Sequence, residues 1–203
     1  MLNHSLRRCP RVKFLREKLE NLGCEMPQES FSCQPCEGME ISGGFVPPTT
    51  KDTRAQVVLC DDKEVTQTMV DHTMAHELVH AYDQCRVKLD RSNCLHVACT
   101  EIRASNTSGE CSFNMEFLRG NWRWGGQQKE CVKRRAELSL KATPGLESTW
   151  SRHSHHATTT RSRTTRIPCK DARVRLRLGK GALGRLRRKT CLYRKGRNSY
   201  QHS

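Results

Sequence analysis

The chain has 203 residues, of which 36 are Lys or Arg and 21 are Asp or Glu, giving a formal net charge of +15. Residues 1–140 hold 19 basic and 19 acidic side chains, so the excess lies entirely in the rest of the chain. This distribution argues against a nucleic-acid-binding domain and favours a neutral globular domain with a basic appendage. No run of about 20 apolar residues could span a bilayer, and no apolar stretch near Met1 resembles a secretory signal.

The N-terminal residues predict a helix. Residues 1–18 carry six basic side chains and one acid, which is compatible with a short remnant of a mitochondrial presequence or, as we favour, with an exposed amphipathic helix. Apolar residues recur at helical spacing from Val12 to Leu22, and Gly23 is suited to end that helix. Residues 30–50 are rich in Cys, Gly, Pro, Ser and Thr, and we expect them to be loop and turn.

The middle of the chain predicts one strand and four helices, and therefore an α+β fold. Residues 56–60 form a short β-type run, and Asp61 and Asp62 follow it as a turn or helix cap. A long helix with a broad apolar face is expected over about residues 64–84. Shorter helices are expected over about residues 95–105, 114–118 and 127–140, with a break at Gly109.

The composition changes after Ala142. Residues 143–203 combine low hydrophobicity with high positive charge, so we expect a largely disordered tail after a domain at residues 1–142. Residues 174–178 alternate briefly like an edge strand. The basic side chains of residues 161–197 could contact the phosphates of nucleic acid or of an anionic membrane. Such runs are more often simply solvated, and we expect no specific nucleic-acid binding.

Ten of the twelve cysteines fall in residues 1–140. They either form disulfides in an oxidising compartment or bind metal, and their scattered spacing favours disulfides. Cys33 and Cys36 form a C-x-x-C pair without a second such pair, which supports a zinc ribbon only weakly.

The strongest chemical signal is the H-E-x-x-H motif of His76, Glu77 and His80 on the predicted long helix. Two histidines four residues apart lie on one face of a helix, about 6 Å apart along its axis, and both can bind one zinc ion. Glu77 lies beside them and can take a proton from the attacking water. The alternative is a pair of surface histidines without a metal, and the amphipathic helix favours the metal site.

A catalytic zinc ion needs a third protein ligand. Glu101 is the best candidate, because it follows His80 by 21 residues on the next predicted helix, a spacing similar to that in thermolysin-like zincins. An ordinary surface or ion-paired carboxylate is the alternative. Asp83 lies about 10.5 Å along the helix from His76, too far to share the ion, and is expected to accept a hydrogen bond from a ligand histidine. His96 either stabilises an oxyanion in the cleft or satisfies a core hydrogen bond.

The sequence around the motif resembles a known family. It reads H-E-L-V-H-A-Y-D-Q-C-R at residues 76–86, A-C-T-E-I-R-A-S-N-T-S-G-E-C at 98–111 and C-V-K-R-R-A at 131–136. Over about residues 10–142 the chain is similar to the mitochondrial inner-membrane metalloproteases that process and assemble ATP synthase. The plant members are the most similar, since their usual sequence matches Asn93-Cys94 and Phe117-Leu118-Arg119-Gly120.

The resemblance implies a peripheral zinc metalloendopeptidase on the intermembrane-space side of the mitochondrial inner membrane. Its protein substrate would be the precursor of a membrane-sector subunit of ATP synthase, and it would assist ATP synthase assembly, partly without proteolysis. By motif match, His76 and His80 are implied as zinc ligands and Glu77 as the catalytic residue. We expect a small zincin-like core with a short sheet and an active-site helix. A protease-inactive assembly factor is the alternative function.

Three features depart from the family pattern. Arg91 stands where the family usually has Trp, residues 47–55 lengthen a loop, and the family's C-terminal section is absent after about Ala142. We interpret the tail as the product of a shifted reading frame or of an alternative exon. Sequencing the transcript across the codons for Lys141 to Gly145 tests this interpretation, and an abundant, unbroken message encoding the tail would contradict the idea that the tail is an artefact.

Overall fold

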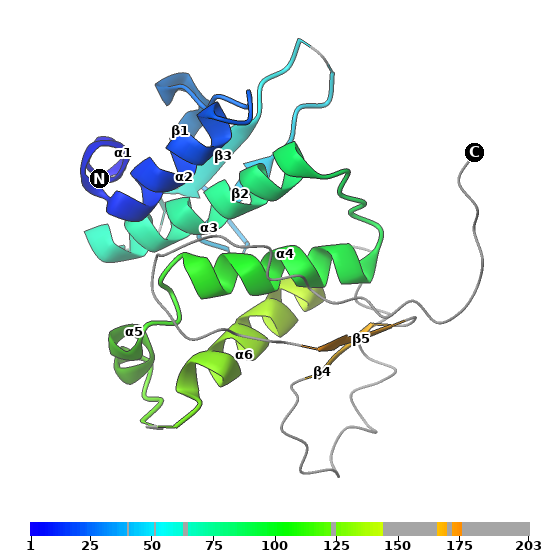
Figure 1. Cartoon of the computed structure of the whole chain (residues 1–203). Coiled ribbons are helices and arrows are strands. Elements are labelled where there is room, and N and C mark those ends of the chain that lie inside the picture. The colour runs from blue at the N-terminus through cyan, green and yellow to red at the C-terminus, as the bar shows by residue number, and fades with distance from the viewer. Residues whose placement is uncertain are drawn as a thin grey trace, which may run out of the picture.

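The computed structural model describes residues 1–39, 41–50, 52–62, 65–122 and 125–143, and the backbone of residues 166–169 and 172–175. Figure 1 shows helices stacked beside a small sheet, which confirms the predicted α+β composition. The elements in chain order are α1 (Leu2–Arg8), α2 (Pro10–Glu20), the 3-10 turn Gln28–Ser30, β1 (Phe31–Gln34), β2 (Gly43–Val46), β3 (Gln56–Cys60), α3 (Gln67–Arg86), α4 (Cys94–Thr107), α5 (Phe113–Leu118), α6 (Gln127–Ala142), β4 (Arg166–Cys169) and β5 (Ala172–Arg175).

The first 20 residues form two helices that belong to the core. Pro10 occupies the first turn of α2, where its missing N–H would have no helical partner, and it separates α2 from α1. One apolar face that runs along both helices is buried. The expectation of an exposed N-terminal helix is therefore wrong for this face, which is formed by Leu6, Cys9, Val12, Leu15 and Leu19. Gly23 adopts a left-handed φ of 76° just beyond the end of α2, as predicted.

The sheet has β3 at its centre, parallel to β1 and antiparallel to β2. Both outer strands lie in residues 30–50, so the expectation of loop and turn is wrong for residues 31–34 and 43–46. Each has only four residues, and pairing with β3 stabilises a segment whose own composition favours turns. A Cβ atom at Gly43 would lie 2.7 Å from the Val58 carbonyl oxygen and 2.9 Å from Thr73 Cγ2, so glycine permits β2 to approach both β3 and α3.

Helix α3 lies at the centre of the molecule, between α2 on one side and α4 on the other (Figure 1). It also packs against β2 and β3, and Met74, Ala75 and Leu78 are fully buried. The Thr66 side chain accepts a hydrogen bond from the Met69 N–H. Thr66 is therefore the N-cap, rather than Asp61 or Asp62.

Helices α4 and α6 enclose a second apolar cluster. The Asn93 side chain caps α4 by accepting hydrogen bonds from the N–H groups of Leu95 and His96. One face of α4 packs on α6 and another on α3, so α4 joins the two halves of the core. Helices α3 to α6 match the four predicted helices, with ends displaced by three residues or fewer.

Disulfides link these elements, as the cysteine spacing predicts. Cys24 bonds to Cys85, Cys36 to Cys60, and Cys111 to Cys131, and Cys94 and Cys99 are also disulfide-bonded. Since Cys36 is in a disulfide and Cys33 is a free thiol, the C-x-x-C pair does not form a zinc ribbon.

No helix within the described ranges is both long enough and apolar enough to cross a membrane. Beyond Thr143, strands β4 and β5 pair antiparallel, with Arg166 opposite Arg175, and β5 overlaps the strand predicted at residues 174–178. The predicted disorder of the rest of the tail lies outside the described residues.

The short helix α5 is attached to α6 through a buried carboxylate. Glu116 is 1% exposed, and both its oxygens lie 2.7 Å from Arg134 Nη2. Arg119 and Asn121 also donate to it, at 2.9 and 3.0 Å. Burial raises the pKa of Glu116, but the hydrogen bonds and charges of Arg134 and Arg119 outweigh burial and lower it below its ordinary value.

We expect Glu116→Gln to lower the free energy of unfolding by about 1–3 kcal/mol at neutral pH, because it weakens a buried, charge-assisted network. Since the folded-state pKa is lowered, this contribution is complete above a pH of about 4.3 and is lost as the pH falls below it. Urea unfolding of both proteins from about pH 7 to about pH 4 measures the difference.

Glu137→Gln is the matched control, because Glu137 pairs with Lys133 at 3.8 Å on a partly exposed helix face. Its effect should stay below about 0.5 kcal/mol. Equal stability of the Glu116→Gln variant and the wild type at neutral pH would contradict the prediction.

Candidate metal centre

The H-E-x-x-H histidines face a carboxylate of the neighbouring helix. His76 and His80 lie one turn apart on α3, with ring centroids 4.8 Å apart. Glu101 of α4 points between them, with its two oxygens each 3.4 Å from one Nε2 atom. One ligand atom from each of the three residues lies within 4.8 Å of the other two. The structure thus brings together the three residues predicted to hold the metal.

This donor set fits a zinc ion. A separation of 3.4 Å is long for a hydrogen bond. It is close to the ~3.4 Å expected between two atoms bound tetrahedrally at about 2.0–2.1 Å from one zinc. The Glu101 Oε2 atom is buried and has no hydrogen-bond partner, which is the condition of an oxygen arranged for a cation. Two imidazoles and one glutamate are an established catalytic zinc set, in which the fourth position is left to water.

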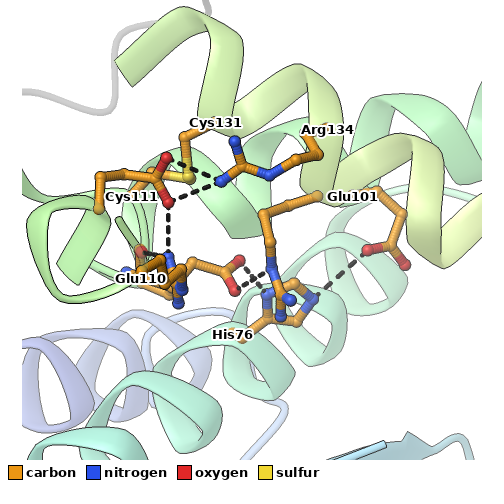
Figure 2. Close-up of polar contacts among 10 residues, drawn as sticks. His76, Glu101, Glu110, Cys111, Cys131 and Arg134 are labelled. Atoms are coloured by element: carbon orange, nitrogen blue, oxygen red, sulfur yellow. Dashed lines mark hydrogen bonds and ion pairs between the residues drawn. A yellow bond between two sulfur atoms is a disulfide. The ribbon is translucent and has the colours of Figure 1, made fainter. Parts of the chain in front are cut away.

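The other nitrogen of each imidazole is held by a hydrogen bond. His76 Nδ1 lies 2.9 Å from Glu110 Oε1, and His80 Nδ1 lies 2.9 Å from Thr100 Oγ1. Because a carboxylate only accepts, His76 donates from Nδ1 and keeps Nε2 for the metal side. Figure 2 shows Glu110 on one side of the His76 ring and Glu101 on the other.

These carboxylates make the His76 ring attractive to a cation. Burial lowers the pKa of His76, but the nearby Glu101 carboxylate and the hydrogen bond to Glu110 outweigh burial and raise it well above its ordinary value. Burial raises the pKa of Glu110, but His76 and Arg135 outweigh burial and hold it far below its ordinary value. Arg135 Nε of α6 donates to Glu110 Oε2 at 2.9 Å. A positive charge at His76 Nε2 is therefore stabilised, whether a proton or a metal ion supplies it.

Glu110 is the site residue that sequence reasoning missed. It lies in the turn after α4, where Gly109 has a φ of 95° and a Cβ atom would meet Arg11 Cζ at 2.8 Å. The next residue, Cys111, is bonded to Cys131 of α6 (Figure 2). The only signal in the sequence was the place of Gly109-Glu110-Cys111 inside a segment that resembles the family.

Glu77, the predicted catalytic residue, lies on α3 beside His76 and is 8% exposed. The structure does not test the catalytic role of Glu77, which stays a prediction.

Asp83 and His96 differ from expectation. Asp83 does not accept a hydrogen bond from a ligand histidine; its 1% exposed side chain pairs with Arg103 of α4 and, at 3.3 Å, with Arg86. It therefore locks α3 to α4. His96 is exposed, and its Nδ1 accepts a hydrogen bond from the Asp90 N–H at 3.2 Å, so it does not serve the core. Its contact with an oxyanion stays a prediction.

Comparison with known proteins places the chain among peptidases. The profile of the Peptidase M76 family matches residues 1–160, and thus extends past Ala142, where we expected the resemblance to end. The chain is 41% identical over 147 residues to a protein of Aspergillus clavatus named mitochondrial inner membrane protease atp23, covering 71% of this chain and 59% of that protein.

Two further relatives bear the same name. The protein of Schizosaccharomyces pombe is 38% identical over 140 residues, covering 68% of this chain and 72% of the relative. The protein of Coccidioides immitis is 37% identical over 147 residues, covering 71% of this chain and 59% of the relative. The chain thus spans about three fifths of the length of the Aspergillus and Coccidioides relatives. No solved structure matches it.

We expect Glu110→Gln to weaken zinc binding by about 10–100-fold, because it removes the charge that orients His76 and strengthens its donor nitrogen. Competition with a chromogenic chelator measures the affinity. Glu116→Gln is the control, since Glu116 is also buried but has no hydrogen bond to either histidine; it should lose stability and keep its zinc affinity. Equal zinc affinities for Glu110→Gln and the wild type would rule out the orienting role of Glu110.

We expect Asp83→Asn to lower the stability of the protein more than its zinc affinity. The substitution breaks a buried ion pair between α3 and α4, so the free energy of unfolding should fall by about 3–5 kcal/mol. The zinc affinity of the protein that remains folded should change less than it does in the Glu110→Gln variant. Urea unfolding measures the free energy of unfolding, and chelator competition measures the zinc affinity. A large loss of zinc affinity at unchanged stability would show that Asp83 acts on the metal site.

Proposed function

The chain belongs to the Peptidase M76 family, and we propose that it is a zinc-dependent metalloendopeptidase with a zincin-like core. The observation that carries this proposal is the convergence of His76, His80 and Glu101 beside Glu77. Three ligands and a neighbouring carboxylate base are the groups that zinc-assisted hydrolysis of a peptide bond requires.

Each residue has a role in the proposed reaction. His76, His80 and Glu101 hold the zinc ion, which supplies Lewis acidity when bound. The Glu77 carboxylate takes a proton from the attacking water and passes it to the leaving amide nitrogen. Glu110 and Thr100 hold the two imidazoles in position through Nδ1.

We propose that the protein acts at the mitochondrial inner membrane, because the matched relatives are named mitochondrial inner membrane proteases. We further propose that it lies on the intermembrane-space side, as the family resemblance of its sequence implies. The disulfides agree with an oxidising compartment of this kind. The proposed substrate is the precursor of a membrane-sector subunit of ATP synthase, and the protein would associate peripherally with the membrane and assist ATP synthase assembly.

Cleavage of that membrane-inserted precursor by the wild type and by Glu77→Gln tests the proposal. The substitution keeps the size of the side chain and removes the base, so cleavage should fall by about 100-fold or more while zinc stays bound. Adding a zinc chelator to the wild type should abolish cleavage, and restoring zinc should recover it.

Cleavage that continues in the Glu77→Gln variant at the wild-type rate would refute the assigned base. A wild type that binds zinc and cleaves nothing would favour the alternative, an assembly factor without protease activity.

A further inference from the structure

Exposed apolar side chains cluster on α5 and the residues that follow it. The Phe117 side chain is 44% exposed, Leu118 is 78% exposed and Trp122 is 65% exposed, and Phe113 of the same helix is also exposed. The Phe117 ring lies 4.4 Å from the Trp122 ring and 6.3 Å from the Phe113 ring, measured between centroids. We call Phe113, Phe117, Leu118 and Trp122 the α5 patch. Contiguous exposed apolar groups of this kind mark interaction sites more often than chance.

The polarity of α5 is the reverse of an ordinary surface helix. Its one acidic residue, Glu116, is buried and bound by two arginines, whereas its aromatic residues face solvent. A surface helix normally buries the apolar face and exposes the charge. The fixed Glu116 network therefore holds the aromatic side chains outward.

The surroundings of the α5 patch are basic. Arg119 and Arg134, which both bind Glu116, have side chains that are 32% and 41% exposed, so this cluster of three charged groups carries a net positive charge. Glu116 is also the only acidic residue between Phe113 and Trp122, and it is buried. Residues 113–143 contain seven Lys and Arg against three Glu.

We propose that the α5 patch docks the protein on the surface of an anionic lipid bilayer. Trp and Phe favour the interface between water and hydrocarbon, where Phe117, Leu118 and Trp122 would insert. Arg119 and Arg134 would lie at the level of the lipid phosphates, to which basic side chains are attracted. A second copy of the chain fits less well, because a symmetric contact would bring the same basic side chains together.

The α5 patch is mechanically connected to the candidate metal centre. Arg119 Nη1 donates a hydrogen bond to the Glu110 carbonyl oxygen at 2.6 Å, and the Glu110 side chain accepts a hydrogen bond from His76. Docking through α5 would therefore hold the metal centre at the membrane surface. The inference rests on the proposed membrane association and adds to it the surface that makes the contact.

Flotation of the full chain with vesicles tests the inference, using phosphatidylcholine alone and phosphatidylcholine mixed with phosphatidylglycerol. The wild type should bind the mixed vesicles, and Leu118→Ser and Trp122→Ser should each lower the partition coefficient by about tenfold, since each removes a large apolar group from the contact. Leu138→Ser is the matched control, because Leu138 of α6 is 50% exposed and lies outside the α5 patch. It should bind as the wild type does.

Three outcomes would overturn the inference. The wild type could bind no vesicles, or the double variant Leu118→Ser/Trp122→Ser could bind as tightly as the wild type, which would assign binding to other basic segments. A dimer of the wild type in solution that Leu118→Ser dissociates would assign the patch to a second copy. Glu77→Gln separates this inference from the peptidase proposal, because that variant should lose cleavage and bind vesicles as the wild type does.

Discussion

The Glu101 carboxylate lies 3.4 Å from an Nε2 atom of both His76 and His80, and this convergence requires a fixed position of α3 against α4. Three polar side chains from two helices can converge only if the helices keep one register. The Asp83 ion pair with Arg103 fixes that register from within the interface. The sheet and α2 cover α3 on one side, and α6 covers α4 on the other. The small sheet thus acts as support for the helix that carries the motif.

A second line of support runs from α6 to the metal centre. Arg135 binds Glu110, Glu110 binds His76, and the Cys111–Cys131 disulfide anchors the same turn to α6. Helix α6 supplies none of the three proposed metal ligands, yet it helps to orient the His76 imidazole through a chain of charge-assisted hydrogen bonds. Such bonds are stronger than neutral ones, particularly where water is excluded. In a chain with a small sheet, the disulfide and this network provide rigidity that strands supply in larger folds.

Periodicity in the sequence predicted α2 to α6 well, because each carries enough apolar residues at helical spacing to reveal its buried face. It missed β1 and β2, whose four-residue strands depend on pairing with β3. The motif and the spacing predicted that His76, His80 and Glu101 would meet, since helix geometry limits which residues can reach a common point, and the three side chains do converge. That they bind zinc stays a proposal. The same geometry gave a wrong prediction for the partner of Asp83. Two helical turns put Asp83 on the face of His76, but Arg103 of α4, which no local pattern reveals, binds it instead. Glu110 was missed because a turn, unlike a helix, has no periodicity.

The turn after α4 and the helix α5 form one structural unit. Between Glu110 and Trp122 the chain holds a hydrogen-bond acceptor for His76, a disulfide, a buried carboxylate with two arginines, and then an exposed aromatic surface. Only Gly109, with its positive φ, lets the chain leave α4 in the required direction. Because Arg119 binds both Glu116 and the Glu110 carbonyl, a force applied to the aromatic surface reaches the turn that orients His76. A segment this short, fixed at both ends, can set the direction in which the metal centre faces a surface without any movement of the helices that hold the ligands.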